Sequence, residues 1–118
     1  MSKREIRFLL DDMFQSTQKI KQYTKDLDFD SFLSDDKTID AVVRNFEIIG
    51  EAANRIDPDF KENNLEIEWT RIRGFRNRIV HDYFGIDYEI VWEIIENYID
   101  NLIECLNTLI DNHKTEQT

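Results

Sequence analysis

Apolar residues recur every three or four positions along most of the chain, with charged and amide side chains between them. This spacing predicts amphipathic helices packed around one core. We expect four main helices, at residues 6–27, from 39 to just before Pro58, at roughly 66–84, and from 87 to about 112. The predicted fold class is therefore all-α, an antiparallel helical bundle of four to five helices that forms a single domain over residues 1–118.

Residues that commonly cap or stop a helix mark the expected ends. Asp36 or Thr38 can cap the second helix and Asp87 the fourth, while Gly85 is the expected left-handed stop of the third. The second helix also carries small residues at positions 50, 52 and 53, which would let a neighbouring helix approach closely. The tail at 113–118 is polar and expected to be disordered, so His113 is assigned no role.

The fourth predicted helix has a wider apolar arc than a surface helix usually shows. One stripe contains Val91, Ile95, Tyr98, Leu102, Cys105 and Leu109, and a second contains Trp92, Ile99, Ile103 and Ile110. The second stripe could contact another helix of the same bundle or form a subunit interface. The pattern alone favours neither reading.

Composition narrows the class of protein further. Three glycines and one proline in 118 residues favour helices over a β-sandwich or barrel. Cys105 is the single cysteine, so an internal disulfide and a cysteine-based zinc cage are excluded, and a buried thiol is expected. No uninterrupted apolar run has secretory or membrane-spanning length, which predicts a cytoplasmic protein. The net charge of −10 disfavours non-specific nucleic-acid binding and is compatible with a basic partner protein.

The segment at 71–83 runs against this acidic background. It contains four arginines (Arg71, Arg73, Arg76 and Arg78), then His81 and Tyr83, and no carboxylate occurs between Glu68 and Asp82. Such a cluster indicates an anion site, with phosphate as the leading ligand. On a regular helix Arg76 and His81 would point about 140° apart. Either the helix ends near His81, or a second subunit completes the site.

These residue types fit metal-independent cleavage of RNA. Histidine can give or take a proton near neutrality, and a guanidinium can hold the phosphate through two parallel hydrogen bonds. Arg76 and His81 are the candidates for those roles, and Arg73 and Arg78 are candidate phosphate contacts or ion-pair partners, as is Arg71. Trp69, Ile72 and Val80 are expected in the core. Two distant histidines and scattered carboxylates give no metal site, and no cofactor is expected.

Three segments together resemble one known family. The run from 74 to 83, Gly-Phe-Arg-Asn-Arg-Ile-Val-His-Asp-Tyr, closely resembles the Arg-x4-His-x-Tyr signature of HEPN-domain toxins of the HepT type. Residues 42–54 look like that family's second helix, and residues 84–92 look like the segment that follows its motif. The resemblance covers roughly residues 3–112.

The resemblance implies a HEPN-type bundle that forms a homodimer with the two motifs facing each other. It implies a ribonuclease that is the toxin of a two-component system, with a minimal nucleotidyltransferase as antitoxin. By motif position, Arg76 and His81 are the catalytic pair and Asn77 assists them. Tyr83 is the residue that the partner modifies with AMP from ATP.

Two other interpretations remain open. The chain could be a non-catalytic module that binds nucleotide or RNA and docks a nucleotidyltransferase, which suits the acidic surface. It could also be the neutralising member of its pair, which the intact Arg-His motif disfavours.

Overall fold

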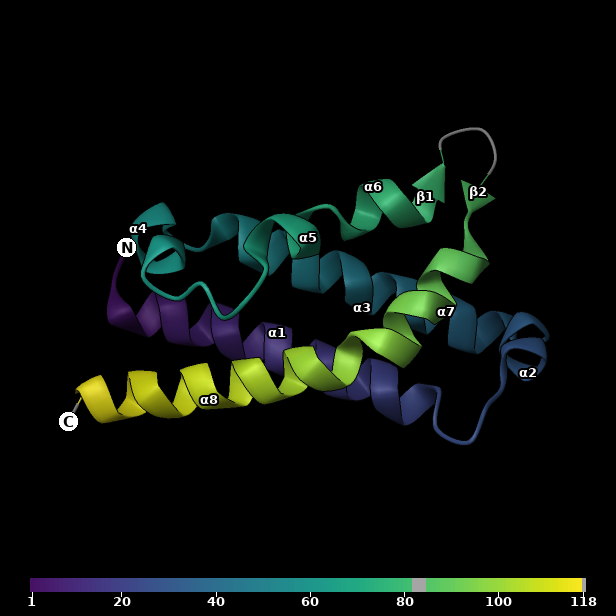
Figure 1. Ribbon diagram of the computed structural model, residues 1–118, viewed down its shortest axis with the longest axis horizontal. Coiled ribbons are helices and arrows are strands. Elements are labelled where there is room, and N and C mark those ends of the chain that lie inside the picture. Colours follow the sequence, from purple (N-terminus) through teal and green to yellow (C-terminus); the bar gives the residue numbers. More distant parts are fainter. Residues whose placement is uncertain (82–84, 118) are drawn as a thin grey trace.

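The computed structural model describes the backbone of residues 1–81 and 85–117, with the side chains of these residues except Arg76, Val80, His81 and 114–117. Within this part the chain forms eight helices and one short hairpin (Figure 1). Their bounds are α1 Lys3–Tyr23, α2 Phe29–Leu33, α3 Asp36–Arg55, α4 Pro58–Glu62, α5 Trp69–Arg73, α6 Phe75–Ile79, β1 Val80–His81, β2 Gly85–Ile86, α7 Tyr88–Asn97 and α8 Ile99–Gln117. The all-α class is confirmed. The excess over four to five helices comes from two short helices in the connections, α2 and α4, and from breaks in the third and fourth predicted helices.

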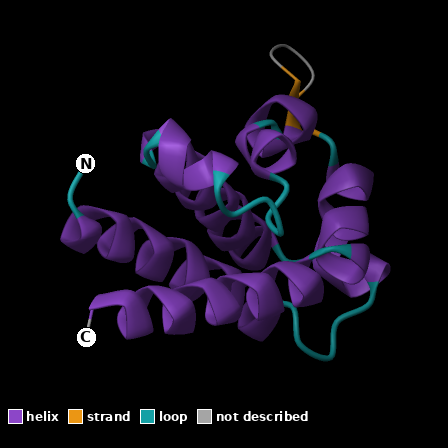
Figure 2. Cartoon of the chain, turned by 60° about the vertical axis from the view of Figure 1, so that its left-hand side comes forward, coloured by secondary structure: helices purple, strands orange, loops and turns teal. Residues whose placement is uncertain are grey.

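Three long helices form the body of the bundle. Helix α1 packs against both α3 and α8, and each of these runs antiparallel to it (Figures 1 and 2). The apolar face predicted for the first helix is the buried one, with Leu10, Met13 and Ile20 fully enclosed. Phe46 and Ile49 of α3 enter the same core. Burying each such side chain contributes about 1.5–3 kcal/mol.

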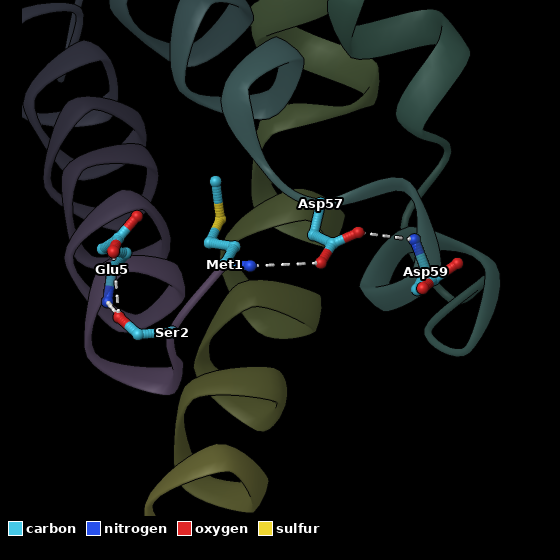
Figure 3. Close-up of polar contacts among 5 residues, drawn as sticks. All are labelled: Met1, Ser2, Glu5, Asp57 and Asp59. Atoms are coloured by element: carbon cyan, nitrogen blue, oxygen red, sulfur yellow. Dashed lines mark hydrogen bonds and ion pairs between the residues drawn. The ribbon is translucent and has the colours of Figure 1, made fainter.

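Side-chain caps fix the helix ends at the N-terminal side of the bundle (Figure 3). The Ser2 hydroxyl accepts a hydrogen bond from the Glu5 amide at 3.1 Å and donates one to the Glu5 carboxylate at 3.2 Å. Asp57 caps α4 by accepting from the Asp59 amide, and its other oxygen lies 3.8 Å from the Met1 amino group. These contacts tie the start of α1 to the turn after α3.

Two predicted boundaries near the first connection were wrong. Helix α1 ends at Tyr23, so Leu27 lies beyond it, and α2 lies in the connection expected between the first two helices. The cap of α3 is Asp35, neither Asp36 nor Thr38. The Asp35 carboxylate accepts hydrogen bonds from both the amide and the hydroxyl of Thr38, and these bonds lower the pKa of Asp35.

The third predicted helix is broken. Gly74 ends α5 by donating its amide to the Thr70 carbonyl at 3.1 Å, and α6 then runs only from Phe75 to Ile79. Val80 and His81 pair with Ile86 and Gly85 as a two-residue antiparallel hairpin. Gly85 has the positive φ expected of it, +80°, but it belongs to this hairpin and does not stop a helix.

The fourth predicted helix is two helices. Asp87 caps α7 as expected, accepting from the Ile90 amide at 3.1 Å. The backbone leaves helical geometry at Tyr98, where φ is −131°, and α8 follows. Helix α8 continues to Gln117, beyond the expected end of the fourth helix at about residue 112. His113 is 4% exposed, and its Nε2 lies 2.8 Å from the Lys3 carbonyl oxygen.

No helix in the described part of the chain has the length and apolar character needed to cross a membrane.

Candidate functional site

The residues of the predicted catalytic motif lie where a short helix gives way to the hairpin. Arg76 and Asn77 belong to α6, which ends at Ile79, and His81 belongs to β1. Of the two alternatives that the sequence left open, the structure shows the first, a helix that ends near His81, so the 140° separation of a regular helix does not apply. The side chains of Arg76 and His81 and the whole of Tyr83 lie outside the described residues.

Apolar side chains hold this motif segment against the bundle. Phe75 is fully buried, with its ring edge-on to Phe46 at 5.3 Å and to Tyr98 at 5.9 Å between centroids. Ile79 is 1% exposed and closes the other end of α6. These anchors connect α6 to both α3 and the α7–α8 break. The backbone that carries Arg76 is therefore set by tertiary packing, because a five-residue helix has little stability of its own.

Arg71 is part of the fold. Its guanidinium carbon lies 4.1 Å from the centroid of the Tyr98 ring, and one terminal nitrogen is 3.2 Å from the Glu68 carboxylate. Burial, with the negative charge of Glu68 as a second cause, raises the pKa of Tyr98 to about 12. The expectation that Arg71 could be an ion-pair partner is confirmed. Trp69 and Ile72, on the same helix, are in the core as predicted.

Arg73 and Arg78 are exposed, and neither has an ion pair with another described residue. Near Arg73, Lys61 donates to the Ala53 carbonyl at 3.0 Å. Partial burial and the positive charge of Arg73 together lower the pKa of Lys61. The positive charge of Arg73 therefore acts on the Lys61 ammonium. The role of Arg73 and Arg78 as phosphate contacts stays a prediction.

A groove of about 490 Å³ runs between α3 and the α5–α6 segment. It is lined by Glu47, Gly50, Glu51 and Asn54 of α3, and by Thr70, Arg73, Gly74 and Asn77. Asn77 was predicted to belong to the site, but the α3 residues were not. Their spacing of three, four and seven positions places them on one helical face, so the sequence held a signal that could have identified them.

The second apolar stripe of the fourth predicted helix is divided between two environments. Ile99 and Ile110 are buried in the chain's own core, whereas Trp92 and Ile103 remain partly exposed. Trp92, Ile95 and Ile103 line a groove of about 680 Å³ beside the end of α1. One part of the stripe is thus intramolecular packing, and the other part is open to a further contact.

The described residues contain no cluster of three or more histidine, cysteine or acidic side chains that could hold a metal ion. Cys105 is partly buried, with its sulfur 3.6 Å from the Glu66 carbonyl oxygen. Burial, more than the neighbouring glutamates, raises the pKa of this thiol. A protonated thiol is a poor nucleophile and a poor metal ligand, so Cys105 is best understood as packing.

Comparison with known proteins agrees with this combination of helical bundle and basic motif. The family described as "Ribonuclease HepT-like" matches residues 13–109. The chain belongs to this family, which confirms the resemblance drawn from the motif.

Relatives of similar length support the assignment. A protein of Methanocaldococcus jannaschii that is provisionally named as an RNase is 36% identical over 116 residues, which cover 98% of this chain and 96% of that protein. "Probable ribonuclease HepT" of Thermococcus cleftensis is 37% identical over 85% of this chain and 91% of its own length. A provisionally named RNase of Caldanaerobacter subterraneus subsp. tengcongensis is 31% identical over 89% of this chain and 94% of its own. No solved structure matches the chain significantly.

Proposed function

We propose that this chain is the toxin ribonuclease of a toxin–antitoxin pair and that it cuts RNA without a metal ion. The observation that carries the proposal is the end of α6 at Ile79. Arg76 is on this helix and His81 is on the following strand. Their side chains therefore need not point about 140° apart, as they would on one regular helix. The family supports ribonuclease activity.

In the proposed reaction the ribose 2′-hydroxyl attacks the adjacent phosphorus and the bond to the 5′-oxygen breaks. His81 transfers a proton in this step, from the attacking hydroxyl or to the leaving oxygen. Arg76 stabilises the negative charge that grows on the non-bridging oxygens. Asn77 assists by hydrogen bonding, and Arg73 and Arg78 contact flanking phosphates. The products are a 2′,3′-cyclic phosphate and a 5′-hydroxyl.

We further propose that the active form is a homodimer with the two motifs facing one cleft. The partly exposed residues Trp92, Ile95 and Ile103 support self-association, since such side chains gain by further burial. A second copy of the motif would also double the local positive charge. That would help a chain with net charge −10 to hold an RNA strand.

The partner in this proposal is a minimal nucleotidyltransferase that adds AMP to Tyr83. The adduct would bring a phosphate next to the arginines that otherwise meet RNA. Tyr83 follows His81 by two residues, so the modification would also crowd the proton-transfer group. Inhibition would then follow from occupation of the anion site by the protein's own adduct.

The test is cleavage of total cellular RNA by purified protein in EDTA. Mass spectrometry first confirms that Tyr83 carries no AMP, because a modified protein would be silent. We expect Arg76→Ala and His81→Ala each to lower the rate by about a hundredfold or more. Arg44→Ala, which removes an exposed arginine of α3, is the matched control and should cleave normally.

The second candidate function is a non-catalytic module that binds nucleotide or RNA and docks the nucleotidyltransferase. The net charge of −10 favours it, because this charge repels RNA and suits protein docking. A folded, unmodified protein that binds RNA but leaves it intact would establish this alternative. Cleavage in EDTA that is lost in His81→Ala would exclude it.

A further inference from the structure

The groove between α3 and the α5–α6 segment contains charged groups that the proposed cleavage reaction does not use. Glu47 and Glu51 lie on the α3 wall, and Arg73 lies on the opposite wall. Among the described residues, neither glutamate has an ion-pair partner. Asn54, Thr70 and Asn77 also line the groove and add neutral donors and acceptors, so the groove has both a cation and acceptors to offer a ligand.

Two glutamates on the wall of a groove beside an RNA-cutting motif affect which substrate can bind there. Each one repels the phosphates of the substrate and so weakens binding. The repulsion is offset if the carboxylate accepts hydrogen bonds from a part of the substrate that donates them. In a single strand, those donors are the edges of unstacked bases.

The bases differ in how well they match a carboxylate. Guanine presents N1–H and N2–H₂ side by side, so it can donate two parallel hydrogen bonds to the two oxygens of one carboxylate. Adenine and cytosine each present one amino group next to an acceptor nitrogen. Uracil presents one N–H between two carbonyl oxygens, which a carboxylate repels. The carboxylates of Glu47 and Glu51 should therefore bind guanine best and uracil worst.

The groove has room for a nucleotide. Its volume of about 490 Å³ falls within the range usual for small-molecule sites, roughly 300–1,000 Å³. Two of its lining residues are Gly50 and Gly74, so no side chain fills the space at these positions. A Cβ atom added at Gly50 would meet only the Ile72 carbonyl oxygen, at 3.5 Å.

We propose that this groove is a base subsite that selects guanosine in single-stranded RNA, with Glu47 and Glu51 as the acceptors and Arg73 at the adjoining phosphate. The inference rests on the proposed ribonuclease function and adds a sequence preference to it. Asn77 lines the groove directly after Arg76 in the chain, so a base bound there would fix the strand next to the motif.

The experiment uses a library of RNA with a randomised single-stranded region and sequences the new ends after cleavage. Unmodified wild-type protein is compared with Glu47→Gln, Glu51→Gln and the double variant. Asp40→Asn is the matched control, because Asp40 is an exposed carboxylate of α3 that does not line the groove. A thermal melt confirms that each variant is folded.

We expect wild-type ends to be enriched in guanosine at one fixed position from the cut. In the double variant this enrichment should fall roughly tenfold to a hundredfold, the discrimination that a bidentate base contact supplies. Adenosine should gain, because a glutamine amide offers one acceptor and one donor, which match the adenine edge. Asp40→Asn should leave the profile unchanged.

Arg73→Ala separates phosphate contact from base recognition. This variant should bind all RNA sequences more weakly, by a similar factor. The dependence of the binding constant on salt concentration should fall by the equivalent of about one phosphate contact. The preference for guanosine should be kept. If the wild type cleaves without guanosine enrichment, or if the double variant keeps it, the base subsite is refuted while the ribonuclease function stands. If the wild type does not cleave, the proposed function fails, and the subsite fails with it.

Discussion

The guanidinium of Arg71 lies over the ring of Tyr98, with 4.1 Å between the guanidinium carbon and the ring centroid. Arg71 is on α5, and Tyr98 is the residue at which α7 ends and α8 begins. The contact therefore joins the start of the basic segment to the break in the last long helical region. One of the four clustered arginines is thus in contact with the core residue Tyr98.

Arg71→Ala should lower the free energy of unfolding by about 1–2 kcal/mol, because it removes a partly buried cation–π contact and the ion pair with Glu68. Urea denaturation measures this change. The folded variant should still cleave RNA, in contrast to Arg76→Ala. Arg44→Ala should change stability by less than about 0.5 kcal/mol. Unchanged stability in Arg71→Ala would show that the contact does not contribute.

Tyr98 should make stability fall in strongly alkaline solution. The folded pKa of about 12 lies above the ordinary value of about 10, so the neutral phenol is favoured in the folded state. Its contribution is fully present below pH 10 and is lost as the pH rises through 12. The expected loss between pH 10 and 12 is about 2 kcal/mol. Urea denaturation across this range should show a shallower decline in Tyr98→Phe, and equal slopes would contradict the assignment.

Two glycines should respond to alanine with opposite signs. Gly50 lies within α3, and its added Cβ would make ordinary contact with the Ile72 carbonyl oxygen at 3.5 Å. Gly50→Ala should therefore raise stability by about 0.5–1 kcal/mol. Gly85 has a φ of +80°, which alanine adopts poorly, so Gly85→Ala should lower stability by about 1 kcal/mol. Thermal unfolding of the two variants gives the comparison, and a shift in the same direction for both would refute it.

Tyr83→Phe should separate cleavage from inhibition. Phenylalanine lacks the hydroxyl that would receive AMP, so the variant should keep part of its activity when it is produced with the nucleotidyltransferase and ATP. Cleavage of RNA is measured with and without the partner, and mass spectrometry reports the mass of each protein. Tyr88→Phe is the control, since Tyr88 is an exposed tyrosine on α7. Full inhibition of Tyr83→Phe without any added mass would contradict the proposed role.

The apolar periodicity was a reliable guide to which faces are buried. Ile6, Leu10, Met13 and Ile20 on α1 are all in the core, as their spacing predicted. The polar side of the last helical region is exposed throughout, from Glu93 to Asp111. The sequence predicts such faces because the spacing of apolar residues along a helix is local. An apolar stripe is buried whichever element it packs against.

The breaks in the helices could not be predicted from the apolar periodicity. Gly74 and Tyr98 interrupt regions whose periodicity continues on both sides, so the pattern gave no sign of either break. The first is held by the contacts of Phe75 with Phe46 and Tyr98, which are distant in sequence. His113 was misjudged for the same reason, because the Lys3 carbonyl and the Phe60 ring that contact it come from the other end of the chain and from α4.

By itself, the sequence determined the helical class, the buried face of each long helix and the Arg-His motif with its family. These follow from local spacing and from a run of neighbouring residues. The tertiary structure decided that the motif helix stops at Ile79, that Arg71 belongs to the fold, and that Glu47 and Glu51 face Arg73 across one groove. Each of these depends on contacts between distant segments, which the periodicity of a single chain does not record.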